Sequence, residues 1–351
     1  MTAGKNWLDE PVFILSIGKT GTTLLIALFD GHEEMTVIPE ETDYFSAVHI
    51  PIKMICANPL ISKSRKVDKI FDLMVHGTHL HVLNGHKREK SFAKDNYDYT
   101  AFDFSTFSVE VKKYLNESDL SLSSILKSVP RALAISQSLD QSKLRMWLEK
   151  TPYHIFNVEN KIPALEHAFP KAKFIHIYRN PIDNFIAFRK KDSDKWSEDK
   201  FIYDLKRNVK LTKDHINKDN HYLIRYEDIV LKTESTLKSL TSFLEIEFTE
   251  NMLRPTKSGS AWEGNSVENS QFKGISSTSL DKHLKYDNKD QLRYLEHYLQ
   301  DEIDYLGYKV SYLTPGGNHN GYDGYPEKRK KQDARQELKH RLYYLVTKAS
   351  L

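Results

Sequence analysis

Cysteine is almost absent from this 351-residue chain, because Cys56 is its single example. An intrachain disulfide is therefore excluded, and we expect a reducing, cytoplasmic compartment. Long apolar runs are missing too: no stretch approaches the roughly 20 residues needed to cross a bilayer. The first residues, MTAGKNWLDEP, lack the apolar core of a secretory signal. We expect a soluble, intracellular protein without a transmembrane segment.

The sequence also lacks an excess of either charge. It has 51 Lys and Arg against 48 Asp and Glu, which gives a net charge of +3. This balance is atypical of proteins that coat nucleic acid, so no nucleic-acid partner is expected. The histidines are scattered, and no group of Asp, Glu, His and Cys has the spacing of metal ligands, so no metal is indicated.

Apolar, β-branched runs predict the strands of a buried parallel sheet. These runs cover residues 12–17, 173–178 and 221–226, with a weaker fourth at 145–149. Helical patterns follow Thr22 and Asp183 and fill residues 234–244 and 289–306. Alternating strands and helices predict an α/β fold with a mostly parallel sheet flanked by helices, which binds ligands at the carboxyl ends of its strands.

Residues 46–144 interrupt this alternation and have a helical and irregular character. They form either an insertion packed on the sheet edge or a lid that shapes an acceptor site, and the sequence leaves both open. Residues 1–311 are expected to form a single domain, followed by a linker and a basic C-terminal helix at 312–351. We expect that helix to dock on the body or on a second subunit, which makes a homodimer possible, rather than on a membrane.

The segment VFILSIGKTGTTLLIAL, residues 12–28, joins a strand to a helix through a turn of glycines, threonines and one lysine. Backbone N–H groups in such a turn converge on an anion, and the helix dipole favours negative charge there. The sequence therefore predicts a phosphate site. It is not a Walker A loop, in which the lysine directly follows the last glycine, because Lys19 precedes Gly21 by two residues.

This turn resembles the 5′-phosphosulfate loop of sulfotransferases that use 3′-phosphoadenosine 5′-phosphosulfate (PAPS), in which a basic residue precedes G-T-T. The resemblance implies a P-loop-like sulfotransferase fold that transfers a sulfuryl group from PAPS to a hydroxyl of a small molecule, lipid, glycan or peptide tyrosine. The product would be adenosine 3′,5′-bisphosphate (PAP), and no metal is implied. The residues that would surround the 5′-phosphate are Lys19, Thr20, Gly21, Thr22 and Thr23.

Later segments resemble the same family in the same order. IYRNPIDNFIAF (177–188) is similar to the 3′-phosphate segment, which implies that Arg179 binds that phosphate. LIRYEDI (223–229) resembles a segment whose tyrosine contacts the adenine, here Tyr226. WEGNSVENSQFKGISS (262–277) resembles the loop that closes over the nucleotide, and its matching residues are Lys273, Gly274 and Ile275.

Two positions depart from the family pattern near the 3′-phosphate. Ala187 stands where the family usually has a serine, and Phe272 stands where cytosolic members often place an arginine. Both changes remove a polar contact, and a lost hydroxyl contact weakens a site by about 1 kcal/mol.

The resemblance is closest to the bacterial, tyrosylprotein and glycan branches. IPEETDYF (38–45) is similar to the stretch that carries their catalytic glutamate, which implies Glu41 as the general base, with Glu40 as the alternative. WLEKTPYH (147–154) resembles stretches whose lysine acts in the transition state, which implies that Lys150 stabilises the departing oxygen alongside Lys19.

Ser266 matches a serine that contacts the bridging oxygen in relatives. Cytosolic phenol and steroid sulfotransferases place a basic histidine two residues after their lysine, and Pro152 occupies that position here. The match therefore favours a glutamate base.

Two other functions remain open from the sequence. A P-loop small-molecule kinase would need Mg²⁺ ligands and a lysine after the loop glycine, and neither is seen. A non-catalytic nucleotide- or glycan-binding protein of this fold is suggested by Ala187 and Phe272. No motif specifies the acceptor.

Overall fold

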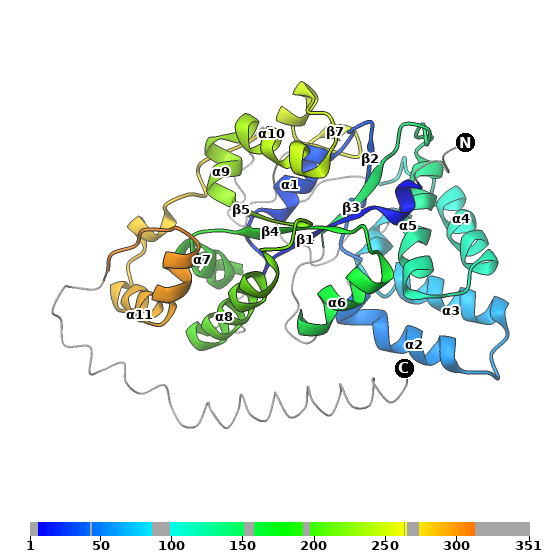
Figure 1. Cartoon of the computed structure of the whole chain (residues 1–351), viewed down its shortest axis with the longest axis horizontal. Coiled ribbons are helices and arrows are strands. Elements are labelled where there is room, and N and C mark those ends of the chain that lie inside the picture. The colour runs from blue at the N-terminus through cyan, green and yellow to red at the C-terminus, as the bar shows by residue number, and fades with distance from the viewer. Residues whose placement is uncertain are drawn as a thin grey trace.

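The computed structural model describes residues 6–42, 44–85, 99–150, 158–191, 197–262, 264 and 274–312. Five parallel strands form one sheet in the order β2-β3-β1-β4-β5. The strands are β1 (Pro11–Leu15), β2 (Met35–Val37), β3 (Met146–Lys150), β4 (Lys173–Tyr178) and β5 (His221–Arg225). Helices flank this sheet (Figure 1), so the predicted α/β fold is confirmed.

The helices divide into those around the sheet and those between β2 and β3. The first group contains α1 (Thr22–Phe29), α6 (Val158–Ala168), α7 (Pro181–Lys191), α8 (Glu198–His215), α9 (Tyr226–Leu231), α10 (Thr233–Leu244) and α11 (Lys289–Tyr305). The second contains α2 (His49–Ala57), α3 (Lys63–Val75), α4 (Phe104–Glu117), α5 (Leu122–Ser136) and the 3₁₀ helix η3 (His79–Asn84). Helices α6, α8 and α9 lie outside the helical ranges that the sequence predicted.

Within the described residues, no helix has both the length and the apolar character that a membrane crossing requires. The linker and basic helix predicted for residues 312–351 lie almost wholly outside the described residues, which end at Tyr312.

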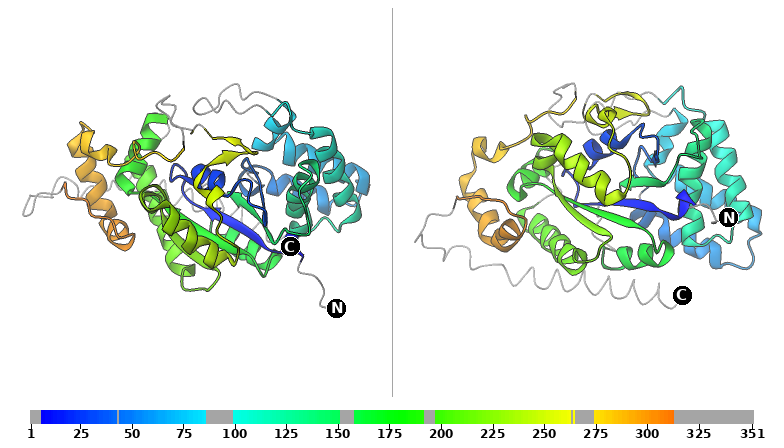
Figure 2. Two further views of the ribbon diagram at one scale, coloured as in Figure 1. Left: turned by 90° about the horizontal axis from the view of Figure 1, so that it is seen from above. Right: turned by 45° about the horizontal axis from the view of Figure 1, so that its top comes forward.

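The alternation of side chains along β1 explains why the sheet is covered on both faces. Val12 and Ile14 belong to one apolar cluster with Leu25 of α1 and Leu237 of α10. Phe13 and Leu15 belong to another, together with apolar residues of α6. Accordingly α1, α9 and α10 lie on one side of the sheet and α6 and α8 on the other (Figures 1 and 2).

The strand order creates a switch point at β1. The chain passes from β1 to β2 and β3 on one side, and then to β4 and β5 on the other. The loops after β3 and β4 therefore flank the loop after β1, and ligands of open α/β sheets bind at such a crevice.

The segment between β2 and β3 shares a core with the sheet. Phe107 of α4 and Ile125 and Val129 of α5 are buried in the same cluster as Phe13 and Trp147. The helices between β2 and β3 therefore pack directly against the sheet.

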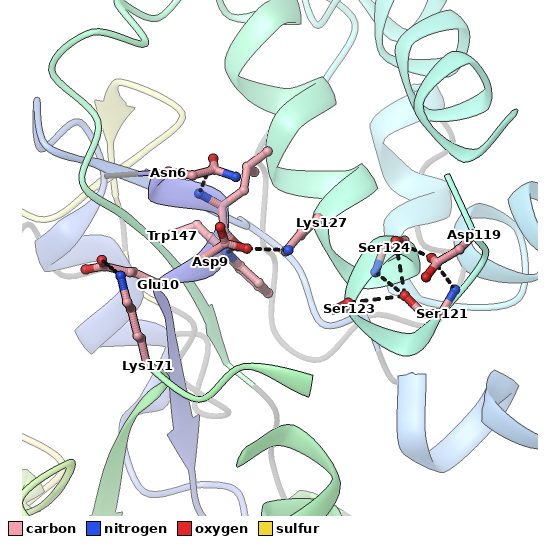
Figure 3. Close-up of polar contacts among 11 residues, drawn as sticks. Asn6, Asp9, Glu10, Asp119, Ser121, Ser123, Ser124, Lys127, Trp147 and Lys171 are labelled. Atoms are coloured by element: carbon pink, nitrogen blue, oxygen red, sulfur yellow. Dashed lines mark hydrogen bonds and ion pairs between the residues drawn. The ribbon is translucent and has the colours of Figure 1, made fainter. Parts of the chain in front are cut away.

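The 3₁₀ helix η1 (Trp7–Asp9) reinforces this junction. Lys127 of α5 forms an ion pair with Asp9 (Figure 3). The Trp147 indole donates a hydrogen bond to the Leu8 carbonyl at 3.1 Å. The start of the chain thus ties α5 to the sheet.

A buried histidine pair lies between β4, β5 and α8. His176 Nε2 is 2.9 Å from His221 Nδ1, and His176 Nδ1 is 2.9 Å from the Thr212 hydroxyl. Burial lowers the pKa of His176 to about 3 and the pKa of His221 to about 4. Both imidazoles are therefore neutral in the folded protein at neutral pH.

This pair predicts a loss of stability on mild acidification. Below the unperturbed histidine pKa of about 6.5, the unfolded chain binds protons that the folded chain refuses until about pH 4 or lower. The urea midpoint should therefore fall between pH 7 and pH 5, and it should fall less in His176→Gln. The exposed His167 provides the control, since His167→Gln should keep the parent's difference. Equal midpoints at both pH values in the parent would contradict the prediction.

Candidate active site

The turn between β1 and α1 has an unusual backbone. Gly18, Lys19 and Gly21 have φ values of 88°, 55° and 90°, and a non-glycine residue rarely adopts such a value. Gly21 is the N-cap of α1, and Thr22 and Thr23 form its first turn. Turns of this kind, followed by a helix N-terminus, are suited to bind anions.

Lys150 connects this turn with the end of β3. Its ammonium donates a hydrogen bond to the Thr23 hydroxyl at 2.9 Å and lies 3.1 Å from Glu41 Oε1. The Lys150 side chain is 9% exposed. Glu41, which follows β2, is therefore linked to the turn before α1 through its nearly buried ion pair with Lys150.

Lys19 belongs to the same group of charges. Burial and the neighbouring charge of Lys150 lower the pKa of Lys19 to about 8, although the carboxylate of Glu41 opposes this shift. Lys19, Lys150 and Glu41 thus interact electrostatically and sum to one positive charge at neutral pH.

The residues on either side of Glu41 have other partners. Glu40 accepts hydrogen bonds from Lys257 at 2.8 Å and from the Tyr99 hydroxyl at 2.9 Å, and it is buried. Thr42 donates a very short hydrogen bond to the buried Glu149 of β3. These contacts fix the backbone and place Glu41, not Glu40, beside Lys150.

Glu41 has a second partner that the sequence did not suggest. Nδ1 of His79, at the start of η3, lies 3.6 Å from Glu41 Oε2. Burial alone would raise the pKa of the Glu41 carboxyl, but Lys150 and His79 outweigh burial and hold it well below its usual range. The Glu41 carboxyl is therefore ionised at neutral pH.

Arg179 stands directly after β4, on the other side of the turn. Its guanidinium lies 5.1 Å above the Tyr226 ring, donates to the Ser279 carbonyl and is 3.8 Å from Asp183 Oδ2. The Tyr226 ring in turn packs against Gly21, where a Cβ atom would lie 2.2 Å from Tyr226 Cδ2. Tyr226 thus joins Arg179 to the turn.

Two further contacts hold these loops together. The Asn184 amide of α7 donates to the Gly18 carbonyl at 3.1 Å. Glu227, next to Tyr226, accepts from the Asn180 backbone N–H at 2.9 Å and from the Tyr308 hydroxyl at 2.6 Å. Glu227 therefore joins the residue after Arg179 to the segment that follows α11, which gives it a structural role.

Asp183, Asp281 and His283 also gather near Arg179, with potential ligand atoms within 4.8 Å of one another. No sequence pattern indicates this group, because Asp183 and His283 are 100 positions apart. Asp183 Oδ1 accepts hydrogen bonds from both the backbone and Nδ1 of His283, at 2.9 and 2.7 Å. The cluster is thus explained by a structural contact, because these bonds connect α7 with the segment around His283.

The other predicted site positions either make no polar side-chain contact with the turn or lie outside the described residues. Gly274 has φ 79°, and Ile275 packs on the apolar cluster that contains Tyr226. Ser266, Phe272 and Lys273 lie outside the described residues. The residues that sequence reasoning missed are His79, Asn184 and Glu227. The partners that reveal each of them are distant in the sequence.

The geometry defines an α/β protein with lysines and an arginine around a turn at a helix start, an arrangement suited to bind an anion. The sulfotransferase family matches residues 11–250, and the chain belongs to that family. This range contains the turn, Glu41, Lys150, Arg179 and Tyr226. No curated protein sequence is significantly similar to the chain.

Solved structures agree on the fold. A sulfotransferase domain from the curacin biosynthetic pathway is 19% identical, with a TM-score of 0.51 over 86% of this chain and 98% of that one. The sulfotransferase domain of the olefin synthase from Synechococcus PCC 7002 is 17% identical, with the same TM-score over 86% of this chain and 96% of that one. At this identity, the likeness establishes the fold alone.

The contact between Gly21 and Tyr226 predicts a steric effect of Gly21→Ala. The new methyl group collides with a ring that is itself buried, so the variant should lose clearly more than 1 kcal/mol of unfolding free energy. Gly31→Ala is the matched control, because Gly31 has φ 79° with nothing within 4 Å of an added Cβ. That control should lose only about 1 kcal/mol, from backbone strain. Equal losses in urea unfolding would show that Tyr226 does not pack on the turn.

Proposed function

We propose that the protein transfers a sulfuryl group from PAPS to a hydroxyl acceptor, with Glu41 as the general base. The observation that carries this proposal is the meeting of Lys19, Lys150 and Glu41 at the turn before α1. A two-ended nucleotide needs a second cation nearby, and Arg179 supplies one across the Tyr226 ring.

Unsatisfied buried donors support the fit of such a nucleotide. Thr20 Oγ1 and Arg179 Nε are buried, and neither has a hydrogen-bond partner among the described residues. Buried polar groups are rarely left unpaired, so these two atoms favour polar ligand groups at both places. The turn fits a 5′-phosphate, and the guanidinium of Arg179 fits the 3′-phosphate. The Tyr226 ring between them suits an adenine edge.

The chemistry divides between the chain's residues by charge. PAPS supplies the sulfuryl group and a bisphosphate leaving group when bound. Lys19 and Lys150 would stabilise negative charge on the departing oxygen, and the N-terminus of α1 would add to that field. Glu41 would remove the proton of the acceptor hydroxyl. Fixed neighbours at Glu40 and Thr42 keep this carboxylate in place.

The ion pair between Glu41 and Lys150 sets the order of events. While paired, Glu41 is a weak base, since its pKa is held low by Lys150. As Lys150 turns its charge toward the departing oxygen, its hold on Glu41 weakens and the proton affinity of the carboxylate rises. Base strength would thus develop together with leaving-group charge.

The remaining expectations belong to this proposal. The acceptor is a hydroxyl compound of a class that the contacts do not specify, and the helices between β2 and β3 would shape its site. The half-buried thiol of Cys56 suits a reducing, cytoplasmic compartment. A homodimer through the C-terminal segment stays a prediction.

Replacing the base should separate chemistry from binding. Glu41→Gln should lower kcat for ³⁵S transfer from labelled PAPS by about 10²- to 10⁴-fold, because the amide cannot accept the proton. Its affinity for PAP should not fall, because the neutral amide no longer offsets the positive charge of Lys150 beside the turn.

Glu40→Gln distinguishes the two glutamates. It disrupts a buried ion pair with Lys257, so it should lower the melting temperature while the folded fraction keeps a similar kcat. The opposite pattern would assign the base to Glu40. Full transfer by both variants would rule out a glutamate base.

The 3′-phosphate contact can be tested with two nucleotides. Arg179→Ala should weaken PAP binding about 10- to 100-fold in calorimetry, since a charge-assisted contact is worth about 1.5–3 kcal/mol. Adenosine 5′-monophosphate lacks the 3′-phosphate and should lose much less affinity. Equal losses for both nucleotides would place the 3′-phosphate elsewhere. Tighter binding of ATP with Mg²⁺ than of PAP by the parent would overturn the proposed function.

A further inference from the structure

The two oxygens of the Glu41 carboxylate have different partners. Oε1 faces the Lys150 ammonium at 3.1 Å, and Oε2 faces Nδ1 of His79 at 3.6 Å. An ammonium carries only donors and cannot accept a proton, whereas a neutral imidazole can. Among the ion-pair partners of Glu41 in the described part of the chain, His79 is the one that can receive a proton.

Exposure increases along these three side chains in the direction of His79. Lys150 is 9% exposed, Glu41 is 19% exposed and His79 is 39% exposed. The inner oxygen of Glu41 thus faces the turn, and the outer oxygen faces a group that reaches solvent. This gradient gives a proton a short route out of the site.

The local fold holds His79 in place. The Thr78 hydroxyl caps η3 by accepting from the Leu80 N–H at 3.2 Å, and it donates to the Met74 carbonyl at 2.5 Å. Leu80 is fully buried, which anchors the start of η3 in the core. Gly77 allows the tight turn from α3, because a Cβ there would lie 2.5 Å from the Leu73 carbonyl oxygen.

We propose that His79 takes the proton from Glu41 after each transfer and passes it to solvent. This inference rests on the proposed function. The acceptor oxygen bonds to sulfur while the bond from sulfur to the bridging oxygen breaks, and the leaving bisphosphate keeps that electron pair. The acceptor proton goes to Glu41 Oε2 and then to the buried Nδ1 of His79, and the imidazole releases its other proton, from Nε2, to water.

The electrostatics of Glu41 favour such a relay. Lys150 holds the Glu41 pKa below its usual range, so a proton on this carboxyl is unstable once Lys150 returns to it. The separation of 3.6 Å is slightly longer than a hydrogen bond, and catalytic contacts often shorten when the substrate binds. His79 acts through Glu41, so it is a positioning and relay residue and makes no contact with the sulfuryl group.

The experiment compares His79→Ala and His79→Gln with His81→Ala. His81 is the matched control, because it lies in the same 3₁₀ helix and its Nδ1 contacts the Thr78 carbonyl instead of Glu41. We expect both His79 variants to lose kcat by about 10- to 100-fold, at the lower end of acid–base contributions. Added imidazole should restore kcat in His79→Ala. PAP affinity should be unchanged in all three variants, and His81→Ala should keep the parent's kcat.

Each other outcome overturns the inference. Full activity in His79→Gln would mean that a hydrogen bond suffices and no proton passes through position 79. Loss in both variants without imidazole rescue would assign His79 a structural role, which melting temperatures would register. If the parent binds PAP but transfers no sulfuryl group, the proposed function fails, whatever position 79 does.

Discussion

The site depends on the contacts of the Lys150 ammonium, because they join three elements that are distant from one another in the sequence. This ammonium touches Thr23 of α1 and Glu41 after β2 from its own place at the end of β3. Removing ions from water is costly, so a nearly buried pair like this one persists only with good geometry and further hydrogen bonds. Its charge also contributes to the low pKa of Lys19. The proximity of two cations makes an anionic ligand favourable at the turn.

The position of Glu41 is a consequence of its neighbours. Glu40 is held by Lys257 from the short strand β6 (Thr256–Lys257), and Thr42 is held by Glu149. Anchoring both neighbours fixes the backbone on either side of Glu41, whose side chain then faces Lys150. A pair of adjacent glutamates that looks equivalent in the sequence is thus divided by the fold into one structural and one accessible carboxylate.

Local sequence patterns were enough to predict the central strands and the turn. They could not predict which distant residues pair with one another. The β-branched runs identified the central strands, and the turn with Lys19 and Gly21 was recognisable from residue types alone. The sequence could not show that β3 inserts between β2 and β1, which brings Lys150 to Glu41. Nor could it show Lys257 beside Glu40, 217 positions away, or His79 beside Glu41. Such contacts depend on how the sheet is ordered and on where the helices between β2 and β3 pack.

Those helices bear on how an acceptor would be selected. Their buried residues share one cluster with Phe13 and Trp147 of the sheet, and Lys127 adds an ion pair to Asp9. Swinging them away as a unit would expose this core, at about 25 cal/mol for each Å² of apolar surface. The helices between β2 and β3, which include η3 with His79, therefore hold a fixed position relative to Glu41. Acceptor selection there would depend on shape and on side chains already in place, because these helices pack on the sheet whose loops carry Glu41 and Lys150.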